Sequence, residues 1–112
     1  MKILEEEIER GKLKNAKNVL EGGMVKAVVD VDREIIGVDA EMHADIEQML
    51  LANGSSQDAL WGINIWFKDD DDDFIEFDSM INIRPRQGNR SRGVEDPETR
   101  EKIKAVVAKW IK

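Results

Sequence analysis

Four arginines lie within nine residues of one another, in the stretch INIRPRQGNRSRG (residues 81–93). A guanidinium presents its N–H donors as a rigid planar fork that matches the oxygens of a carboxylate or a phosphate. Pro85 ends the preceding segment, and Gly88 permits the positive φ of a sharp turn. The stretch therefore predicts a loop that binds a small anion. The candidate ligand-binding side chains in it are Arg84, Gln87, Asn89 and Arg90. In the alternative interpretation these arginines only form weak surface pairs with the many acidic residues.

The one histidine of the chain lies in the stretch HADIE (residues 43–47). On a strand, His43, Asp45 and Glu47 would share one face, and a neighbouring carboxylate can orient an imidazole as a general base. His43 and Asp45 are therefore the candidate catalytic pair. A metal site is also conceivable for one histidine and two carboxylates, but neither an HExxH motif nor a second histidine is present. We predict no metal and no cofactor, and an exposed histidine on a polar strand remains the simpler interpretation.

Two asparagines extend this candidate site. Asn64 and Asn82 project outward from strands predicted at 60–67 and 74–84, on the same side as Arg84. If these faces coincide with that of His43, a polar patch on the sheet opens onto the arginine loop. The sequence therefore predicts a small soluble protein that binds an anionic small molecule, a phosphate or a carboxylate, between that loop and the sheet. Whether it is an enzyme stays open.

The clearest element is a helix at the end of the chain. Asp96 is a good N-cap, and Pro97 suits the first helical position. Apolar residues then recur at helical spacing. They are Ile103, Val106, Val107, Trp110 and Ile111.

Two strands are predicted before this helix. LWGINIWF (60–67) alternates, with Trp61, Ile63 and Ile65 on its inward face, and FIEFDSMINIR (74–84) alternates in the same way. The KDDDDD run (68–73) between them predicts an exposed hairpin loop. A third strand is predicted within 41–51, although EMHADIEQMLL can also be read as a short helix.

The stretch 24–38, MVKAVVDVDREIIGV, has two interpretations. Its β-branched residues suggest a hairpin that turns at Asp32 and Arg33. Its apolar residues also step by four and three, and on this ground we favour a helix. A shorter helix is expected at 12–21 and a first strand at MKILEE. The predicted fold is α+β, a three- to four-stranded antiparallel sheet with helices packed on one face, in the order (β)ααβββα.

Length and composition limit the classes of protein. The 112 residues predict a single domain, 1–112, and the absence of cysteine excludes disulfides and thiolate chemistry. The first residues resemble no signal peptide and no apolar run is long enough to cross a membrane, so a cytoplasmic protein is expected.

Charge is unevenly distributed along the chain. Residues 81–112 carry a net +5, whereas the whole chain carries −7. The overall negative charge disfavours nucleic acid as a partner. It also motivates an alternative function, a non-catalytic interaction module whose basic end docks on an acidic partner or on a second copy of the chain.

Three stretches carry a resemblance to a known family. HAD (43–45), DALWGIN (58–64) and INIRPRQGNRS (81–91) resemble a family of small prokaryotic proteins catalogued as a domain of unknown function. The resemblance covers roughly residues 24–112, implies a prokaryotic cytoplasmic protein, and transfers no activity.

A weaker likeness concerns topology alone. The predicted order of elements is similar to that of small ribosome-dependent RNA-cleaving toxins of toxin–antitoxin pairs. Those toxins are basic, whereas this chain is acidic and has no tyrosine. Since the order of elements does not carry function, RNA cleavage remains a minority alternative.

Overall fold

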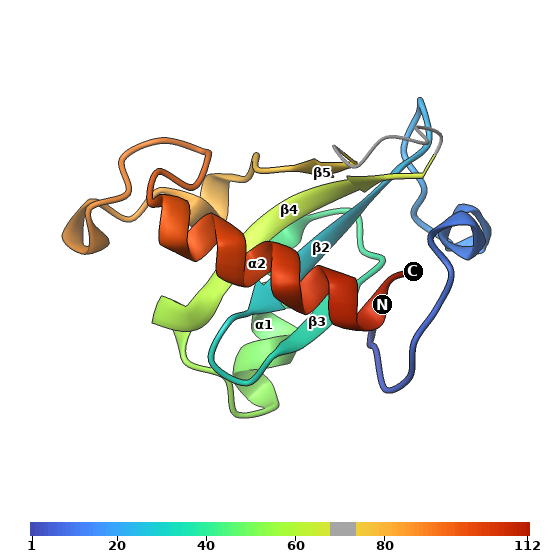
Figure 1. Ribbon diagram of the computed structural model, residues 1–112, viewed down its shortest axis with the longest axis horizontal. Coiled ribbons are helices and arrows are strands. Elements are labelled where there is room, and N and C mark those ends of the chain that lie inside the picture. Colours follow the sequence, from blue (N-terminus) through green and yellow to red (C-terminus); the bar gives the residue numbers. More distant parts are fainter. Residues whose placement is uncertain (68–73) are drawn as a thin grey trace.

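The computed structural model describes residues 1–67 and 74–112 of the chain (Figure 1). In this part the strands form a five-stranded antiparallel sheet of order β1-β3-β2-β4-β5. The strands are β1 (Lys2–Ile3), β2 (Met24–Asp30), β3 (Ile35–Val38), β4 (Leu60–Trp66) and β5 (Ile75–Glu76). The helices are α1 (His43–Ala52) and α2 (Pro97–Trp110), with short 3₁₀ turns η1 (Arg10–Asn15), η2 (Gln57–Ala59), η3 (Met80–Asn82) and η4 (Pro85–Gln87).

The two α-helices pack on opposite faces of the sheet, because its central strands are apolar on both sides. Toward α2 point Val25, Ala27 and Val29 of β2 and Trp61, Ile63 and Ile65 of β4, against Ile103, Val106 and Val107. Toward α1 point Val28 and Leu60, against Ile46 and Leu50. The predicted α+β class is confirmed, but the helices do not share one face as the sequence suggested.

The helix favoured for residues 24–38 is wrong, and the hairpin alternative is right. β2 and β3 pair from Ala27 opposite Val38 to Asp30 opposite Ile35. The buried Asp30 carboxylate accepts hydrogen bonds from the backbone N–H groups of Asp32 and Arg33, each at 2.9 Å, and so fixes the turn. A central strand that is buried on both faces need not alternate between apolar and polar residues. The apolar run of β2 therefore resembled the apolar face of a helix.

The strand predicted within 41–51 is also wrong, because these residues form α1. Ile46 and Leu50, one helical turn apart, are fully buried against the sheet. Gly37 of β3 makes this contact possible, since a Cβ there would lie 2.6 Å from Cγ2 of Ile46. The observed order of elements, βββαββα, differs from the predicted one accordingly.

The strand predicted at 74–84 is much shorter than expected. β5 pairs with β4 only at Ile75 and Glu76, and the chain then turns through η3. The predicted helix at 12–21 is reduced to η1, whereas the predicted first strand, β4 and α2 are confirmed. The hairpin loop predicted for 68–73 lies outside the described residues. Among the helices of the described residues, none has the length and apolar character needed to cross a bilayer.

Candidate functional site

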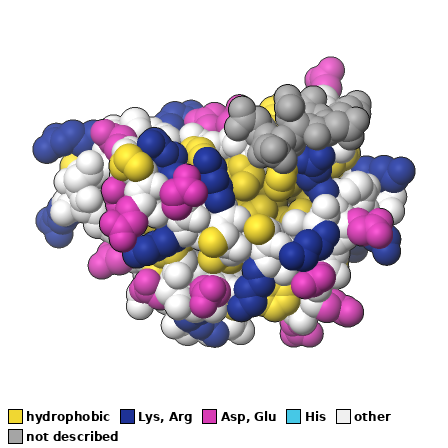
Figure 2. Space-filling model, in the orientation of Figure 1, with side chains coloured by type: hydrophobic (Ala, Val, Ile, Leu, Met, Phe, Trp, Pro, Cys, Tyr) yellow, Lys and Arg dark blue, Asp and Glu magenta, His cyan; other side chains and the backbone are white. Residues whose placement is uncertain are grey.

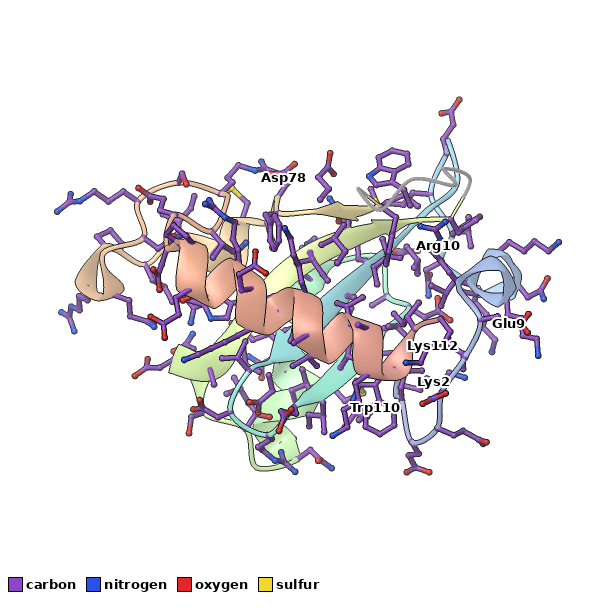
Figure 3. The ribbon with its side chains drawn as sticks, viewed as in Figure 1. Lys2, Glu9, Arg10, Asp78, Trp110 and Lys112 are labelled. Carbon is purple, nitrogen blue, oxygen red and sulfur yellow. The ribbon has the colours of Figure 1, made fainter. Side chains whose placement is uncertain are left out.

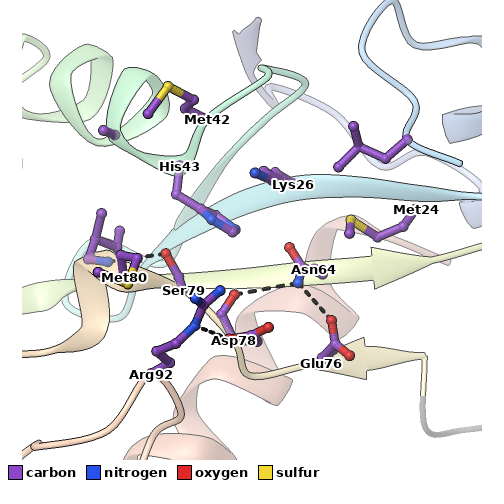
Figure 4. Close-up of a pocket in the computed structure, with 13 residues that line it drawn as sticks. Met24, Lys26, Met42, His43, Asn64, Glu76, Asp78, Ser79, Met80 and Arg92 are labelled. Atoms are coloured by element: carbon purple, nitrogen blue, oxygen red, sulfur yellow. Dashed lines mark hydrogen bonds and ion pairs between the residues drawn. The ribbon is translucent and has the colours of Figure 1, made fainter.

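A pocket of about 350 Å³ opens on the α1 face of the sheet, beside the first turn of α1 (Figure 4). It lies between α1, β2, β4, β5 and the segment that leads into η3. Its polar lining consists of Lys26, His43, Asn64, Glu76, Asp78, Ser79 and Arg92. Its apolar lining consists of Leu20, Met24, Met42, Ala44, Met80 and Ile81.

The floor of the pocket is a row of three polar side chains on adjacent strands. Lys26 of β2 pairs in register with Asn64 of β4, which pairs in turn with Glu76 of β5. Residues in register on neighbouring strands project to the same face of a sheet. The row therefore has a cation at one end, an amide in the middle and a carboxylate at the other end.

The Asn64 amide has an unused acceptor. Asn64 is 4% exposed, and its Nδ2 donates to Oε1 of Glu76 at 2.7 Å and to the Asp78 carbonyl at 3.4 Å. Exchanging the amide atoms would set Oδ1 against these two acceptors, so the orientation is fixed. Oδ1 is buried and accepts a hydrogen bond from no described residue, and it lies on the side of Lys26 (Figure 4). Buried polar atoms normally have a partner, so this oxygen is open to a donor.

The two cations of the pocket differ in their partners. The Arg92 guanidinium forms an ion pair with Asp78, with Nε 2.6 Å from Oδ1. Lys26 is half-buried, and no ion pair joins it to a carboxylate of the described residues. The Lys26 ammonium is therefore the cation with donors to spare.

His43 is the first residue of α1 and is 8% exposed. Its Nε2 lies 2.8 Å from the Ile63 carbonyl oxygen, which can only accept, so Nε2 carries the hydrogen. Burial lowers the pKa of His43; the bond to Ile63 opposes this effect and the charge of Lys26 adds to it. At neutral pH the imidazole is therefore uncharged, with Nδ1 as its acceptor nitrogen.

The structure does not bring His43 and Asp45 together. Asp45 is exposed and lines a different, shallow hollow with Asp39 and Glu41. The separation follows from the local structure, because residues two apart share a face on a strand but not on a helix.

Arg84 and Gln87 lie outside the pocket and hold the loop against the start of β4. The Arg84 guanidinium stacks over the Trp61 ring, 4.2 Å from its centroid, and donates to the carbonyls of Gln57 and Leu60. Gln87 donates to the Asp58 carbonyl at 3.1 Å. Both terminal nitrogens of Arg84 and the Gln87 amide are thus occupied by backbone oxygens, whereas Nε of Arg84 is buried without a partner among the described residues.

The remaining predicted residues are also outside the pocket. Asn82 is fully buried and bonds to both backbone groups of Gly62 and to the Arg92 carbonyl. Asn89 is 4% exposed and donates to the carbonyls of Asn82, Ser91 and Gly93. Arg90 is exposed, and its backbone N–H donates to Glu95. Of the predicted site residues, His43 and Asn64 line the pocket.

The sequence interpretation missed Lys26, Glu76 and Asp78 as site residues, and it included Arg92 only as one of the four arginines of the loop. A signal for Lys26 was present, because it is the one charge within the apolar run MVKAVV. Charged residues are rarely buried unless they are paired, so a lone charge inside a central strand indicates a candidate site residue. Within residues 1–67 and 74–112, no group of three or more His, Cys, Asp or Glu side chains is placed to hold a metal ion.

The fold and the pocket define a small α+β protein with a polar pocket on one face of an antiparallel sheet. Residues 2–110 match a family described as "Protein of unknown function (DUF5674)", and the chain belongs to that family. The resemblance noted in the sequence is thereby confirmed. No curated protein and no solved structure matches the chain.

Proposed function

We propose that this protein binds a small molecule bearing a carboxylate, held in the pocket by the Lys26 ammonium. The observation that carries the proposal is a half-buried cation without a counter-ion among the described residues, beside a pocket of about 350 Å³. A cation withdrawn from water is costly unless an anion pairs with it. A ligand carboxylate supplies that anion, and it can form a charge-assisted hydrogen bond to the ammonium.

A carboxylate fits this pocket better than a phosphate. The charges of Lys26 and Arg92 are balanced by those of Glu76 and Asp78, and His43 is uncharged at neutral pH. A phosphate carries up to two negative charges near neutral pH, and both would lie close to the carboxylates on the other side of the pocket. A singly charged anion is repelled less and still pairs with Lys26.

The size and apolar lining of the pocket suit a small organic acid. Its volume is near the lower end of the range of about 300–1,000 Å³ that ligand pockets occupy. Side chains of Met24, Met42 and Met80 line it, and methionine adapts to ligands of different shape. A carboxylate attached to a short hydrocarbon chain would contact both the Lys26 ammonium and the apolar lining.

Isothermal titration with hexanoate tests the proposal, with inorganic phosphate as the comparison. We expect hexanoate to bind the wild type more tightly than phosphate does. The variant Lys26→Met, which keeps much of the side chain but not its charge, should bind hexanoate about tenfold more weakly or worse, a loss of about 1.4 kcal/mol.

Lys14→Met is the matched control, because Lys14 is exposed and belongs to η1, away from the pocket lining. Lys14→Met should bind hexanoate as the wild type does. Hexanoate binding that is absent, or that Lys26→Met leaves intact, would refute the proposed carboxylate site.

A further inference from the structure

We infer that the ligand is a zwitterion, an α-amino acid with an unbranched apolar side chain, whose ammonium group binds Asn64 and Glu76. This inference rests on the proposed carboxylate site and specifies what else the ligand must carry. It starts from the hydrogen-bonding groups that a simple carboxylate would leave unsatisfied.

The pocket has more unused acceptors than a carboxylate ligand can serve. Oδ1 of Asn64 is buried and accepts no hydrogen bond from the described residues. In addition, only one Glu76 oxygen, Oε1, receives the Asn64 amide. A carboxylate has no hydrogen to donate, whereas an ammonium group donates several. A buried acceptor left unsatisfied is unfavourable, so a donor on the ligand is favoured.

The charges along the floor are arranged to match a zwitterion. Lys26, Asn64 and Glu76 are in register on three adjacent strands, in that order. Since neighbouring strands are about 4.8 Å apart, the two charged residues start roughly 10 Å apart with the amide between them. The ammonium and carboxylate of an α-amino acid share one carbon atom, so both can lie over Asn64. The carboxylate would then lie toward Lys26, and the ammonium between Oδ1 of Asn64 and Glu76.

Glu76 is the carboxylate that remains available for this role. Asp78 already pairs with Arg92 at 2.6 Å, and its backbone carbonyl accepts from Asn64. Glu76 takes part in no ion pair with the described residues, and it is exposed at its end of the pocket floor. An incoming ammonium can therefore reach it without breaking an existing pair.

Two apolar side chains at the mouth of the pocket are exposed to solvent. Met42 and Met80 are 58% and 65% exposed, among the most exposed large apolar residues described. Both line the pocket (Figure 4), one from the segment before α1 and the other from η3. Flexible thioether side chains at the rim would pack on an unbranched hydrocarbon chain that leaves the amino-acid group.

Three probes that share one butyl chain separate the contributions of the ligand's ammonium and carboxylate groups to affinity. Norleucine carries both charged groups, hexanoate lacks the ammonium, and pentylamine lacks the carboxylate. We expect isothermal titration of the wild type near neutral pH to give an affinity for norleucine at least tenfold higher than for hexanoate, and weaker binding still for pentylamine. Glu76→Gln, which retains an oxygen for the Asn64 amide, should lower the norleucine affinity about tenfold and leave hexanoate binding unchanged or stronger.

Glu5→Gln is the control, since Glu5 is exposed and does not line the pocket. If hexanoate binds as tightly as norleucine and both depend on Lys26, the zwitterion is refuted and the carboxylate site stands. A norleucine preference that Glu76→Gln leaves intact also refutes the inference. If hexanoate does not bind, or if pentylamine binds as tightly as norleucine, the carboxylate site itself is refuted.

Discussion

His43 joins the start of α1 to the middle of β4, and its protonation state therefore concerns both the pocket and the fold. The ring is buried, and its Nε2–H donates to the Ile63 carbonyl at 2.8 Å. A charged imidazole would have to lie in this buried position with Lys26 nearby, and burial lowers the pKa for that reason. The neutral ring is thus the form that the folded protein prefers.

A pH-dependent loss of stability follows from the lowered pKa of His43. The ordinary pKa is 6.5, so as the pH falls below that value the unfolded chain binds a proton that the folded protein still resists. The contribution of His43 is fully present above pH 6.5 and is lost as the pH falls toward the lower, folded-state pKa. His43→Gln keeps an N–H donor but cannot titrate.

Urea denaturation from about pH 8 to about pH 5 measures this effect. We expect the free energy of unfolding of the wild type to fall more steeply than that of His43→Gln below pH 6.5, and the two curves to run parallel above it. Burial also raises the pKa of Glu47, but this residue is present in both proteins and cancels in the difference. Curves that stay parallel throughout would contradict the buried, neutral state of His43.

At the scale of elements, a side chain replaces the hydrogen bonds of a neighbouring strand on β4 beyond the point where β5 ends. β5 pairs with β4 only at Asn64 and Ile65. At Gly62 the Asn82 side chain takes over, because its Oδ1 accepts from the Gly62 N–H at 2.8 Å and its Nδ2 donates to the Gly62 carbonyl at 2.9 Å. This exchange requires close approach of the η3 segment to β4.

Gly62→Ala should disrupt this approach. A Cβ at Gly62 would lie 2.6 Å from both Cβ and Oγ of Ser79, and Ser79 is itself 1% exposed, so the backbone of one element must move. Overpacking of this kind costs about 1–3 kcal/mol. Urea denaturation should show a loss in that range.

Gly11→Ala provides the matched control, because nothing lies within 4 Å of the added Cβ. We expect its free energy of unfolding to stay within about 0.5 kcal/mol of the wild type. Equal losses in the two variants would mean that the contact between Gly62 and Ser79 does not constrain the fold.

Elements with local signals could be predicted from the sequence, and elements defined by burial could not. The Asp96 side chain caps α2 by accepting from the N–H groups of Glu98 and Thr99, as its position before Pro97 indicated. β2 gave no such signal, because it is buried on both faces and its side chains do not alternate in polarity. α1 was equally hidden, since its buried side includes His43 and Glu47 beside Ile46 and Leu50.

The candidate site was predictable only where it did not depend on strand register. His43 was singled out by its residue type, although the strand predicted for it is α1, and Asn64 by its residue type and its position on β4; both line the pocket. Lys26 joins them through its register with Asn64, which the helical interpretation of 24–38 excluded. Arg84 was expected at the site for its charge, but no local pattern reveals that its donors face backbone carbonyls of Gln57 and Leu60.

At the scale of the whole molecule, the charge imbalance along the sequence is not repeated on the surface over α2. Figure 2 shows basic and acidic side chains interspersed on that face. Contacts such as those of Arg92 with Asp78 and of Lys112 with Glu7 join the basic end of the chain to the acidic part. The face over α2 therefore presents no broad basic surface to an anion, and the proposed anion site depends on Lys26 in the pocket.

The two end segments of the described chain are joined beside α2. Ile8 and Ile111 form a parallel bridge in which the Ile8 N–H donates to the Trp110 carbonyl at 2.9 Å and the Lys112 N–H donates to the Ile8 carbonyl at 2.7 Å. The Trp110 indole also donates to the Glu34 carbonyl in the hairpin turn at 2.8 Å. Figure 3 labels Trp110 and Lys112 at this end of the molecule.

The pairing of the two end segments depends on Ile111, because Ile111 is 3% exposed and belongs to the core between α2 and the sheet. Ile111→Ala should lower the free energy of unfolding by about 2–5 kcal/mol, as expected for a buried isoleucine. It should also speed amide hydrogen exchange at Ile8 and Lys112, since the bridge opens when its packing is lost. Lys112→Ala removes an exposed side chain and keeps both backbone bonds, so its loss should stay within about 0.5 kcal/mol. The opposite result would be that Ile111→Ala changes exchange at Ile8 no more than Lys112→Ala does. The first segment would then be held by its own contacts. The pairing of the two end segments would be a consequence of the fold and would not stabilise it.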